Sequence, residues 1–126
     1  MEKEEALARF LDCSKDEAEK LINDGEYLVL TDAEADTEAK ARILDTIWAF
    51  NKWFLDAHSK VIKHIPDEIY KKLQEECEGI NEMLIESLED KDSFVEDAIA
   101  SDGRGHFLSS YDGKEYQEGE YFIYRQ

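Results

Sequence analysis

Cationic side chains are scarce in this sequence. Lysine and arginine account for 15 of its 126 residues, whereas aspartate and glutamate account for 32, which gives a formal net charge of −17 at pH 7. Proteins that bind DNA, RNA or anionic membranes depend on cationic side chains that meet phosphates and lipid headgroups. Direct binding to nucleic acid or to a membrane surface is therefore disfavoured. A basic partner, or a role of the acidity in solubility alone, is left open.

Cysteines and long apolar runs are also few, and both bear on the cellular compartment in which the protein is expected. The two cysteines, Cys13 and Cys77, lie far apart and belong to no metal-binding or redox spacing, so they cannot form a disulfide scaffold. No apolar run approaches the roughly 18 residues that a membrane span requires. The opening Met-Glu-Lys-Glu-Glu is the reverse of a basic signal peptide. We expect free thiols and a cytoplasmic location.

The motifs that commonly carry catalysis or metal binding are missing as well. The three histidines, His58, His64 and His106, have no spacing that would place two ligands on one helical face. The run that begins at Asp90 resembles the start of a calcium loop, but it has Phe94 where an oxygen ligand belongs. No phosphate-binding loop, nucleophile elbow or dinucleotide fingerprint occurs. We predict a protein that is not an enzyme and that needs no metal or cofactor.

The sequence does contain enough apolar material for a folded core. Apolar residues make up 42% of the chain and aromatic residues 11%, which is not the composition of a disordered chain. A length of 126 residues fits one domain of ordinary size. No internal repeat or low-complexity linker divides the chain. We expect residues 1–126 to form a single domain.

Capping signals and hydrophobic periodicity predict a helical first half. Ser14 and Glu17, and again Thr31 and Glu34, have the three-residue spacing of a capping box, in which each partner satisfies a free backbone N–H of the first helical turn. The stretch between these two signals ends in an aromatic and β-branched segment typical of a strand. The predicted elements are helices over residues 4–11, about 15–22 and 32–59, and a strand over residues 26–30.

The longest predicted helix carries a broad aromatic stripe that includes Trp48 and Trp53. Its apolar residues recur at helical spacing over a face too wide for a helix covered on one side only. We therefore expect this helix at the centre of the core. An aromatic binding surface near the two tryptophans is the alternative interpretation.

The second half is predicted to add two helices and two strands. Pro66 favours the start of a helix, and apolar residues then recur every three or four positions as far as Leu88. Ser93 is a candidate cap for a shorter helix. Together with the strand near residue 27, a C-terminal hairpin completes a small, mainly antiparallel sheet, so the fold class is α+β. The predicted elements are helices over residues 67–88 and 93–100, and strands over residues 107–111 and 121–124.

The acidic residues are concentrated in one part of the sequence. Residues 75–102 contain eleven acids and one lysine, whereas residues 46–66 contain one acid and three lysines. Along the predicted helix over residues 67–88, glutamates recur at intervals of three and four, which places them on one ridge. The candidate partner-binding residues are Glu75, Glu78, Glu82, Glu86, Glu89, Asp90, Asp92, Glu96 and Asp97.

Two interpretations of this ridge are open. From Glu75 to Glu89 a continuous helix would cover roughly 21 Å, a length over which one DNA strand bears about six phosphates. The ridge therefore predicts a mimic of a phosphate strand that occupies the basic groove of a nucleic-acid-binding protein. Alternatively, the glutamates form an ordinary solvated face, which is what charge runs usually do.

The segment from Ser101 to Gly113 combines residue types that occur in active sites. Such a set could carry acid–base or phosphoryl chemistry. We favour a structural role, in which the glycines permit a tight crossing from helix to strand, the first acid pairs with the arginine or caps a helix, and the last acid begins a turn. The candidate motif consists of Asp102, Arg104, His106, Tyr111 and Asp112.

The same segment resembles a known group of proteins. Asp-Gly-Arg-Gly-His at residues 102–106, Ser-Tyr-Asp-Gly at residues 110–113 and Tyr-Phe-Ile-Tyr-Arg at residues 121–125 are similar to the ending of small acidic, mostly uncharacterised proteins of tailed bacteriophages. Several of these also have a stretch like Tyr-Leu-Val-Leu-Thr-Asp, found here at residues 27–32. The resemblance covers the last quarter of the chain and this short stretch. It implies a phage origin more than an activity.

Phages commonly use small acidic proteins against host defences that rely on nucleases. By this analogy, the resemblance implies an inhibitor of a CRISPR complex or a restriction enzyme that acts in the cytoplasm of the bacterial host. The expected partner is then a basic nucleic-acid-binding protein of the host. The alternative is a non-enzymatic adaptor or regulator that binds through an apolar or aromatic surface, while its acids serve solubility.

Overall fold

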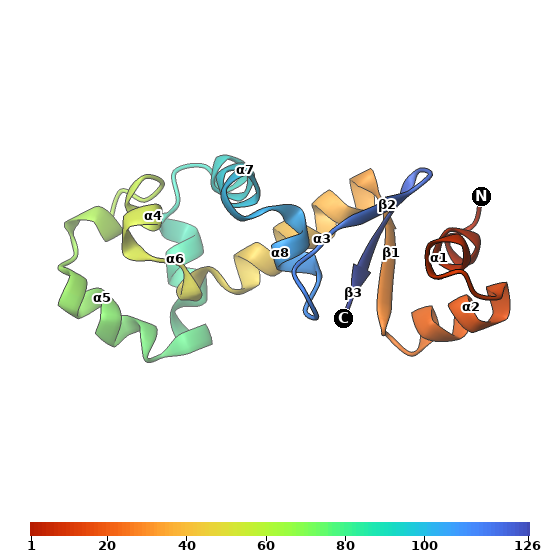
Figure 1. Cartoon of the computed structure of the whole chain (residues 1–126). Coiled ribbons are helices and arrows are strands. Elements are labelled where there is room, and N and C mark those ends of the chain that lie inside the picture. The colour runs from red at the N-terminus through yellow and green to blue at the C-terminus, as the bar shows by residue number, and fades with distance from the viewer. The chain divides into compact units, whose positions relative to one another are not determined.

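The computed structural model describes residues 1–126 and has an α+β fold (Figure 1). The chain is 63% helical, with eight α-helices and one three-stranded antiparallel sheet, so the predicted fold class is confirmed. By packing, the chain forms two compact units. The terminal unit comprises Met1–Ala39 and Asp102–Gln126, and the central unit comprises Lys40–Ser101. That both units make up one domain stays a prediction.

The sheet lies in the terminal unit and combines both ends of the chain. Its strands are β1 (Tyr27–Thr31), β2 (Tyr116–Glu118) and β3 (Tyr121–Arg125), in the order β1-β3-β2. Both pairings are antiparallel, and Val29 lies opposite Ile123. The predicted strands near residues 26–30 and 121–124 are therefore confirmed.

The strand predicted over residues 107–111 is wrong. Residues Arg104–Leu108 form the short helix α8, and the hairpin partner of β3 is β2, which lies between the two predicted C-terminal strands. Gly119, with a φ of 61°, permits the tight reversal between the two strands. The prediction failed because a short apolar run such as Phe107-Leu108 suits a helix as well as a strand.

Two N-terminal helices cover one face of the sheet, and α8 lies on the other side (Figure 1). They are α1 (Lys3–Leu11) and α2 (Lys15–Asn23). The Ser14 hydroxyl accepts a hydrogen bond from the Glu17 backbone N–H at 3.2 Å, which confirms this helix start. Side chains alternate between the faces of a strand, so one set of strand residues meets these helices. The buried cluster between them consists of Ala6, Leu7, Ala18, Val29 and Ile123.

The helix that follows β1 starts as predicted but ends early. In α3 (Asp32–Asp45), the Glu34 N–H donates to the Thr31 hydroxyl at 3.2 Å and the Thr31 N–H donates to Glu34 Oε1 at 2.9 Å, so the capping box is confirmed. The backbone hydrogen bond from Thr31, aided by Lys3, lowers the pKa of Glu34. The predicted continuation of the helix to Ser59 is wrong.

A side chain from a distant part of the sequence accounts for this break. Asn81 Nδ2 donates to the Leu44 carbonyl at 2.5 Å, and Asn81 Oδ1 accepts from the Trp48 N–H at 3.2 Å. The amide thus replaces backbone hydrogen bonds that a continuous helix would make. After the break come a short 3-10 helix, η1 (Ile47–Ala49), and the five-residue helix α4 (Lys52–Asp56).

The helix predicted over residues 67–88 is also interrupted, although it begins after Pro66 as expected. The Gln74 amide donates to the carbonyls of Trp48 and Phe50, at 3.0 and 3.2 Å, and Cys77 then takes a φ of 50°, which a continuous helix does not allow. The observed elements are α5 (Asp67–Gln74), the 3-10 helix η3 (Cys77–Ile80) and α6 (Asn81–Ser87).

The last helix of the central unit is α7 (Lys91–Asp102). It begins before the predicted Ser93, because Asp90 Oδ1 accepts the backbone N–H groups of Asp92 and Ser93, at 3.0 and 3.2 Å. Its Phe94 packs against the rings of Phe50 and Phe54. The larger buried side chains of this unit are Ile43, Ile47, Leu55, Ile62, Tyr70, Leu84 and Phe94.

Trp53 is not part of this core, contrary to our prediction. Its side chain is 72% exposed, whereas Leu55 in the same helix is buried. The long-helix assignment placed Trp53 on the apolar stripe. Once the chain breaks before Lys52, the short helix α4 points its aromatic residues differently, and the tryptophan faces solvent.

Gly105 in α8 marks a close approach of two backbone segments. A Cβ atom at this position would lie 2.8 Å from the Glu115 nitrogen, the Gly113 oxygen and the Lys114 carbonyl carbon. Carbon atoms at such a distance overlap, and none of these backbone atoms can swing aside as a flexible side chain would. Glycine is therefore required where α8 packs on the segment that leads into β2.

We expect Gly105→Ala to lower the free energy of unfolding by about 1–3 kcal/mol, the usual cost of overpacking. Gly79→Ala is the matched control, since its Cβ would meet only Glu76 Cβ at an ordinary 3.7 Å. That variant should change stability by less than about 1 kcal/mol. Urea unfolding followed by circular dichroism measures both. Equal effects of the two substitutions would contradict the close approach at Gly105.

Candidate functional site

The nine acidic residues proposed to bind a partner all lie in the central unit, and all are exposed. Glu75 follows α5, and Glu78 belongs to η3. The others are distributed over α6, the connection after it and α7: Glu82 and Glu86, then Glu89 and Asp90, then Asp92, Glu96 and Asp97.

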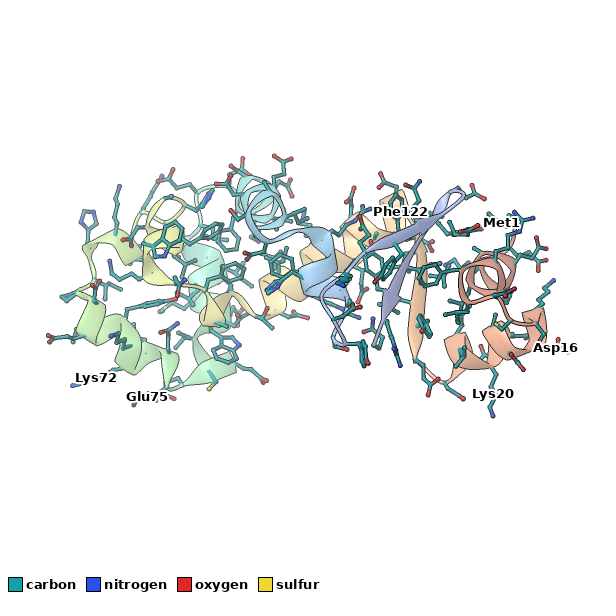
Figure 2. All side chains as sticks on the ribbon, viewed as in Figure 1. Met1, Asp16, Lys20, Lys72, Glu75 and Phe122 are labelled. Carbon is teal, nitrogen blue, oxygen red and sulfur yellow. The ribbon has the colours of Figure 1, made fainter.

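The continuous glutamate ridge predicted from the sequence is wrong. The chain turns at Cys77, and at Leu88 it takes an extended conformation, so Glu75 and Glu89 do not share a helix with Glu82. Figure 2 shows the labelled Lys72 and Glu75 side chains pointing away from the ribbon at α5, so the first acid of the set has a cationic neighbour. The comparison with about six phosphates on a straight strand no longer applies, because it needed one helix.

Some of these acids are used inside the central unit. Asp92 contacts the Lys40 ammonium at 2.5 Å, and this hydrogen bond and charge lower the pKa of Asp92. Asp97 Oδ2 lies 2.7 Å from Nε2 of His58, whose ring packs against Phe94. Asp90 caps α7. The six glutamates of the set, Glu75, Glu78, Glu82, Glu86, Glu89 and Glu96, remain exposed to solvent.

The negative charge is not restricted to this set. By sequence count, the terminal unit holds 18 acids and 7 lysines or arginines. The central unit holds 14 acids and 8 lysines or arginines. The terminal unit is thus the more acidic half, although the predicted binding residues lie elsewhere. Within the central unit, the excess does come from residues 75–97.

Arg104 of the candidate motif is the centre of an ion-pair cluster in the terminal unit. Its guanidinium contacts Asp32 and Asp36 of α3 at 2.9 Å each and Glu115 before β2 at 2.7 Å, and it lies 4.6 Å from the centre of the Phe122 ring. For Asp102 we predicted either a pairing with Arg104 or a cap, and the pairing is wrong, since the partners of Arg104 are Asp32, Asp36 and Glu115. The Arg104 side chain is only 11% exposed, and although burial alone would lower the pKa of Arg104, the hydrogen bonds that it donates to the three carboxylates raise its pKa above the usual value.

Tyr124 extends the cluster around Arg104. Its hydroxyl donates to Glu115, and burial raises the pKa of this tyrosine, as does the neighbouring carboxylate. Nε of the guanidinium donates to Glu115 and Nη1 donates to Asp32 and Asp36, which fixes α3 and α8 to the segment that leads into the hairpin. This arrangement supports the structural interpretation of the motif.

The other motif residues have separate surroundings. The ring of His106 is exposed and meets Phe107 edge to face, with 4.9 Å between centres. The Arg125 guanidinium lies over the Tyr111 ring, with 3.8 Å between its Cζ atom and the ring centre. Asp112 accepts the Lys114 backbone N–H at 3.0 Å, which lowers the pKa of Asp112, and so it forms a turn as predicted.

Sequence reasoning missed a hollow between α4 and α5 in the central unit. Its volume is about 410 Å³, and its lining includes Trp53, Asp56, Asp67, Tyr70, Lys71 and Gln74. The aromatic stripe was the signal that pointed to this region. The hollow itself could not be predicted, because it exists only where the two expected long helices are broken.

Comparisons with known proteins give no relative. A scan of family models, a search of curated proteins and a search of solved structures each found no significant match. Among the helices of the chain, none combines the length and apolar character that crossing a membrane demands.

We expect Arg104→Lys to lower the free energy of unfolding by about 1–2 kcal/mol, because an ammonium cannot replace the planar fork that serves three carboxylates. Arg104→Met should cost more, about 2–4 kcal/mol, since the three carboxylates then repel one another without a counter-charge. Arg125→Lys is the matched control at an exposed site. Urea unfolding of the three variants tests this, and wild-type stability of Arg104→Lys would contradict the structural role.

A second prediction concerns alkaline pH. Tyr70 is buried, its hydroxyl donates to the Phe50 carbonyl at 2.8 Å, and burial raises its pKa from 10.0 to about 12. The folded state thus favours the neutral hydroxyl. The contribution of Tyr70 to the free energy of unfolding is therefore complete below pH 10 and is lost as the pH rises towards 12. By pH 12 the free energy of unfolding should have fallen by about 2 kcal/mol through the ionisation of Tyr70.

The measurement is the free energy of unfolding of the parent and of Tyr70→Phe across this pH range. Other tyrosines and the lysines titrate in both proteins, so the difference between the two isolates Tyr70. We expect Tyr70→Phe to be less stable below pH 10 and the difference to shrink above it. A constant difference at all pH values would contradict the prediction.

Proposed function

We propose that this chain is a non-enzymatic inhibitor that binds the basic, nucleic-acid-binding surface of a host defence protein. The observation that carries the proposal is the exposure of all nine carboxylates of the candidate partner-binding set. Of these, only Asp92 and Asp97 have a basic partner inside the unit. Exposed like charges repel one another, and a cationic partner relieves this repulsion.

The broken helices change how the acids are presented. Pairs at a spacing of four residues remain on α6, with Glu82 and Glu86, and on α7, with Asp92 and Glu96. The binding surface is therefore a set of short acidic helices and connections in place of one straight rod. Its field acts over about 10 Å at 0.1 M salt and accelerates encounter with a basic groove.

The phage resemblance supports the kind of partner. Small acidic proteins of tailed phages provide the analogy for an anti-CRISPR or antirestriction role in the cytoplasm of the bacterial host. We propose a CRISPR effector or a restriction enzyme as the partner class. Arg104 is paired with three carboxylates of its own chain, which supports a structural role, and not a catalytic one, for the motif around it.

Charge reversal tests the acidic surface. We expect the triple substitution Glu78→Lys, Glu82→Lys and Glu86→Lys to weaken partner binding at least about tenfold, because each reversal replaces an attraction by a repulsion. The tagged full chain is incubated with bacterial lysate at low and high salt, and captured proteins are identified by mass spectrometry. The affinity of each purified partner for the parent and for the variant is then measured.

The matched control is Glu19→Lys, Asp24→Lys and Glu120→Lys, which changes the net charge equally at exposed positions of the terminal unit. It should retain binding. Support requires that the partner binds nucleic acid, that binding weakens with salt and that DNA or RNA competes with it. Binding that survives high salt, a complex that keeps nucleic acid in the same groove, or equal losses in both triple variants would overturn the proposal.

The exposure of Trp53 favours a second candidate, a non-enzymatic adaptor or regulator. Exposed tryptophans are common anchors of protein interfaces, and this one lies beside a hollow. In this case the acids serve solubility alone. The triple reversal at Glu78, Glu82 and Glu86 would then leave binding intact, whereas Trp53→Ala would abolish it.

A further inference from the structure

The hollow between α4 and α5 combines an exposed aromatic ring with polar groups. Trp53 lies at this hollow and is 72% exposed, more than any other large apolar side chain of the protein. Its helix is well fixed, since Leu55 is buried and the Phe54 ring packs against Phe50 and Phe94 with centres 5.5 and 5.4 Å away. The indole is thus a large contact surface carried on a helix anchored in the core.

Three hydrogen-bond donors of the hollow are used inside the protein. The Tyr70 hydroxyl donates to the Phe50 carbonyl at 2.8 Å. The Gln74 amide donates to the carbonyls of Trp48 and Phe50. The Lys52 ammonium, with its side chain 15% exposed, contacts both carboxylate oxygens of Asp56 at 3.1 Å. These groups have little capacity left to bind an acceptor on a ligand.

The acceptors of the hollow are less occupied. The Asp67 side chain is 83% exposed, and its carboxylate lies 3.7 Å from Lys52, a loose ion pair. Gln74 uses its amide nitrogen for two internal carbonyls, which leaves its carbonyl oxygen as an acceptor. The face of an indole also attracts cations, and tryptophan is the best of the aromatic residues in this respect. The hollow therefore favours a ligand that is cationic, planar and rich in donors.

Lys71 also lines the hollow and opposes a cationic ligand. It is exposed, and its long side chain can turn its ammonium into solvent. The lining holds two lysines, Lys52 and Lys71, and two aspartates, Asp56 and Asp67, so the lysines give the hollow no net positive charge. The charge of the whole chain, −17, attracts cationic partners.

We propose that this hollow takes an arginine side chain of the cationic partner, with its guanidinium stacked on Trp53 and paired with Asp67. This inference rests on the proposed function, and it adds a specific site to the diffuse attraction of the acidic surface. Arginine fits better than lysine, because a planar guanidinium stacks on an aromatic ring and donates from five N–H groups, whereas an ammonium is a compact, strongly hydrated charge.

The test uses the full chain, labelled with ¹⁵N, and an acetylated and amidated Gly-Arg-Gly peptide as the probe. The titration is run at physiological salt, where diffuse attraction between exposed charges is screened. We expect the indole N–H signal of Trp53 to shift and that of Trp48 to stay. The matched Gly-Lys-Gly peptide should bind several-fold more weakly, since it lacks the planar fork.

Two substitutions and one control complete the design. Trp53→Ala should weaken binding of the arginine peptide about tenfold, and Asp67→Asn should weaken it several-fold. The triple reversal at Glu78, Glu82 and Glu86 should leave peptide binding unchanged, which separates this site from the acidic surface. Equal shifts with both peptides, or binding retained in Trp53→Ala and Asp67→Asn, would overturn the arginine site and leave the proposed function standing.

Discussion

Two side-chain amides hold the central unit in its form, and the features proposed as functional depend on them. Asn81 binds the Leu44 carbonyl and the Trp48 N–H, and Gln74 binds the carbonyls of Trp48 and Phe50. These bonds satisfy backbone groups at helix ends, where a helix leaves N–H and C=O groups without an internal partner, and the Phe50 carbonyl also accepts from the Tyr70 hydroxyl. The amides therefore permit two long helical patterns to break into short pieces, and the Phe50 and Phe54 rings of the first pattern pack against Phe94.

These breaks decide where charge and aromatic surface lie. If the helices were continuous, the glutamates would form one ridge and Trp53 would be buried. In the broken form, the acids lie on α6, α7 and the connections, while Trp53 lies at a hollow between α4 and α5. Acidic surface and exposed indole suit the same class of partner, because a basic surface offers both positive charge and arginine side chains.

The terminal unit depends on a different interaction. Arg104 joins α3 to the hairpin through Asp32, Asp36 and Glu115, and Gly105 beside it lets the two backbones meet. A segment that resembles an active-site motif is thus explained by packing and charge neutralisation. In so acidic a unit, a single buried cation that serves three carboxylates reduces repulsion where the chain must be compact.

The sequence by itself determined what depends on near neighbours. Spacing, propensity and charge account for the N-cap at Ser14, the capping box at Thr31, the strands that contain Val29 and Ile123, the α+β class and the exposure of the acids. Tertiary structure alone decided where the long helices break, which carboxylates Arg104 holds and that Trp53 is exposed. Those outcomes depend on hydrogen bonds and ion pairs between residues 11 to 72 positions apart, and local periodicity carries no information about such contacts.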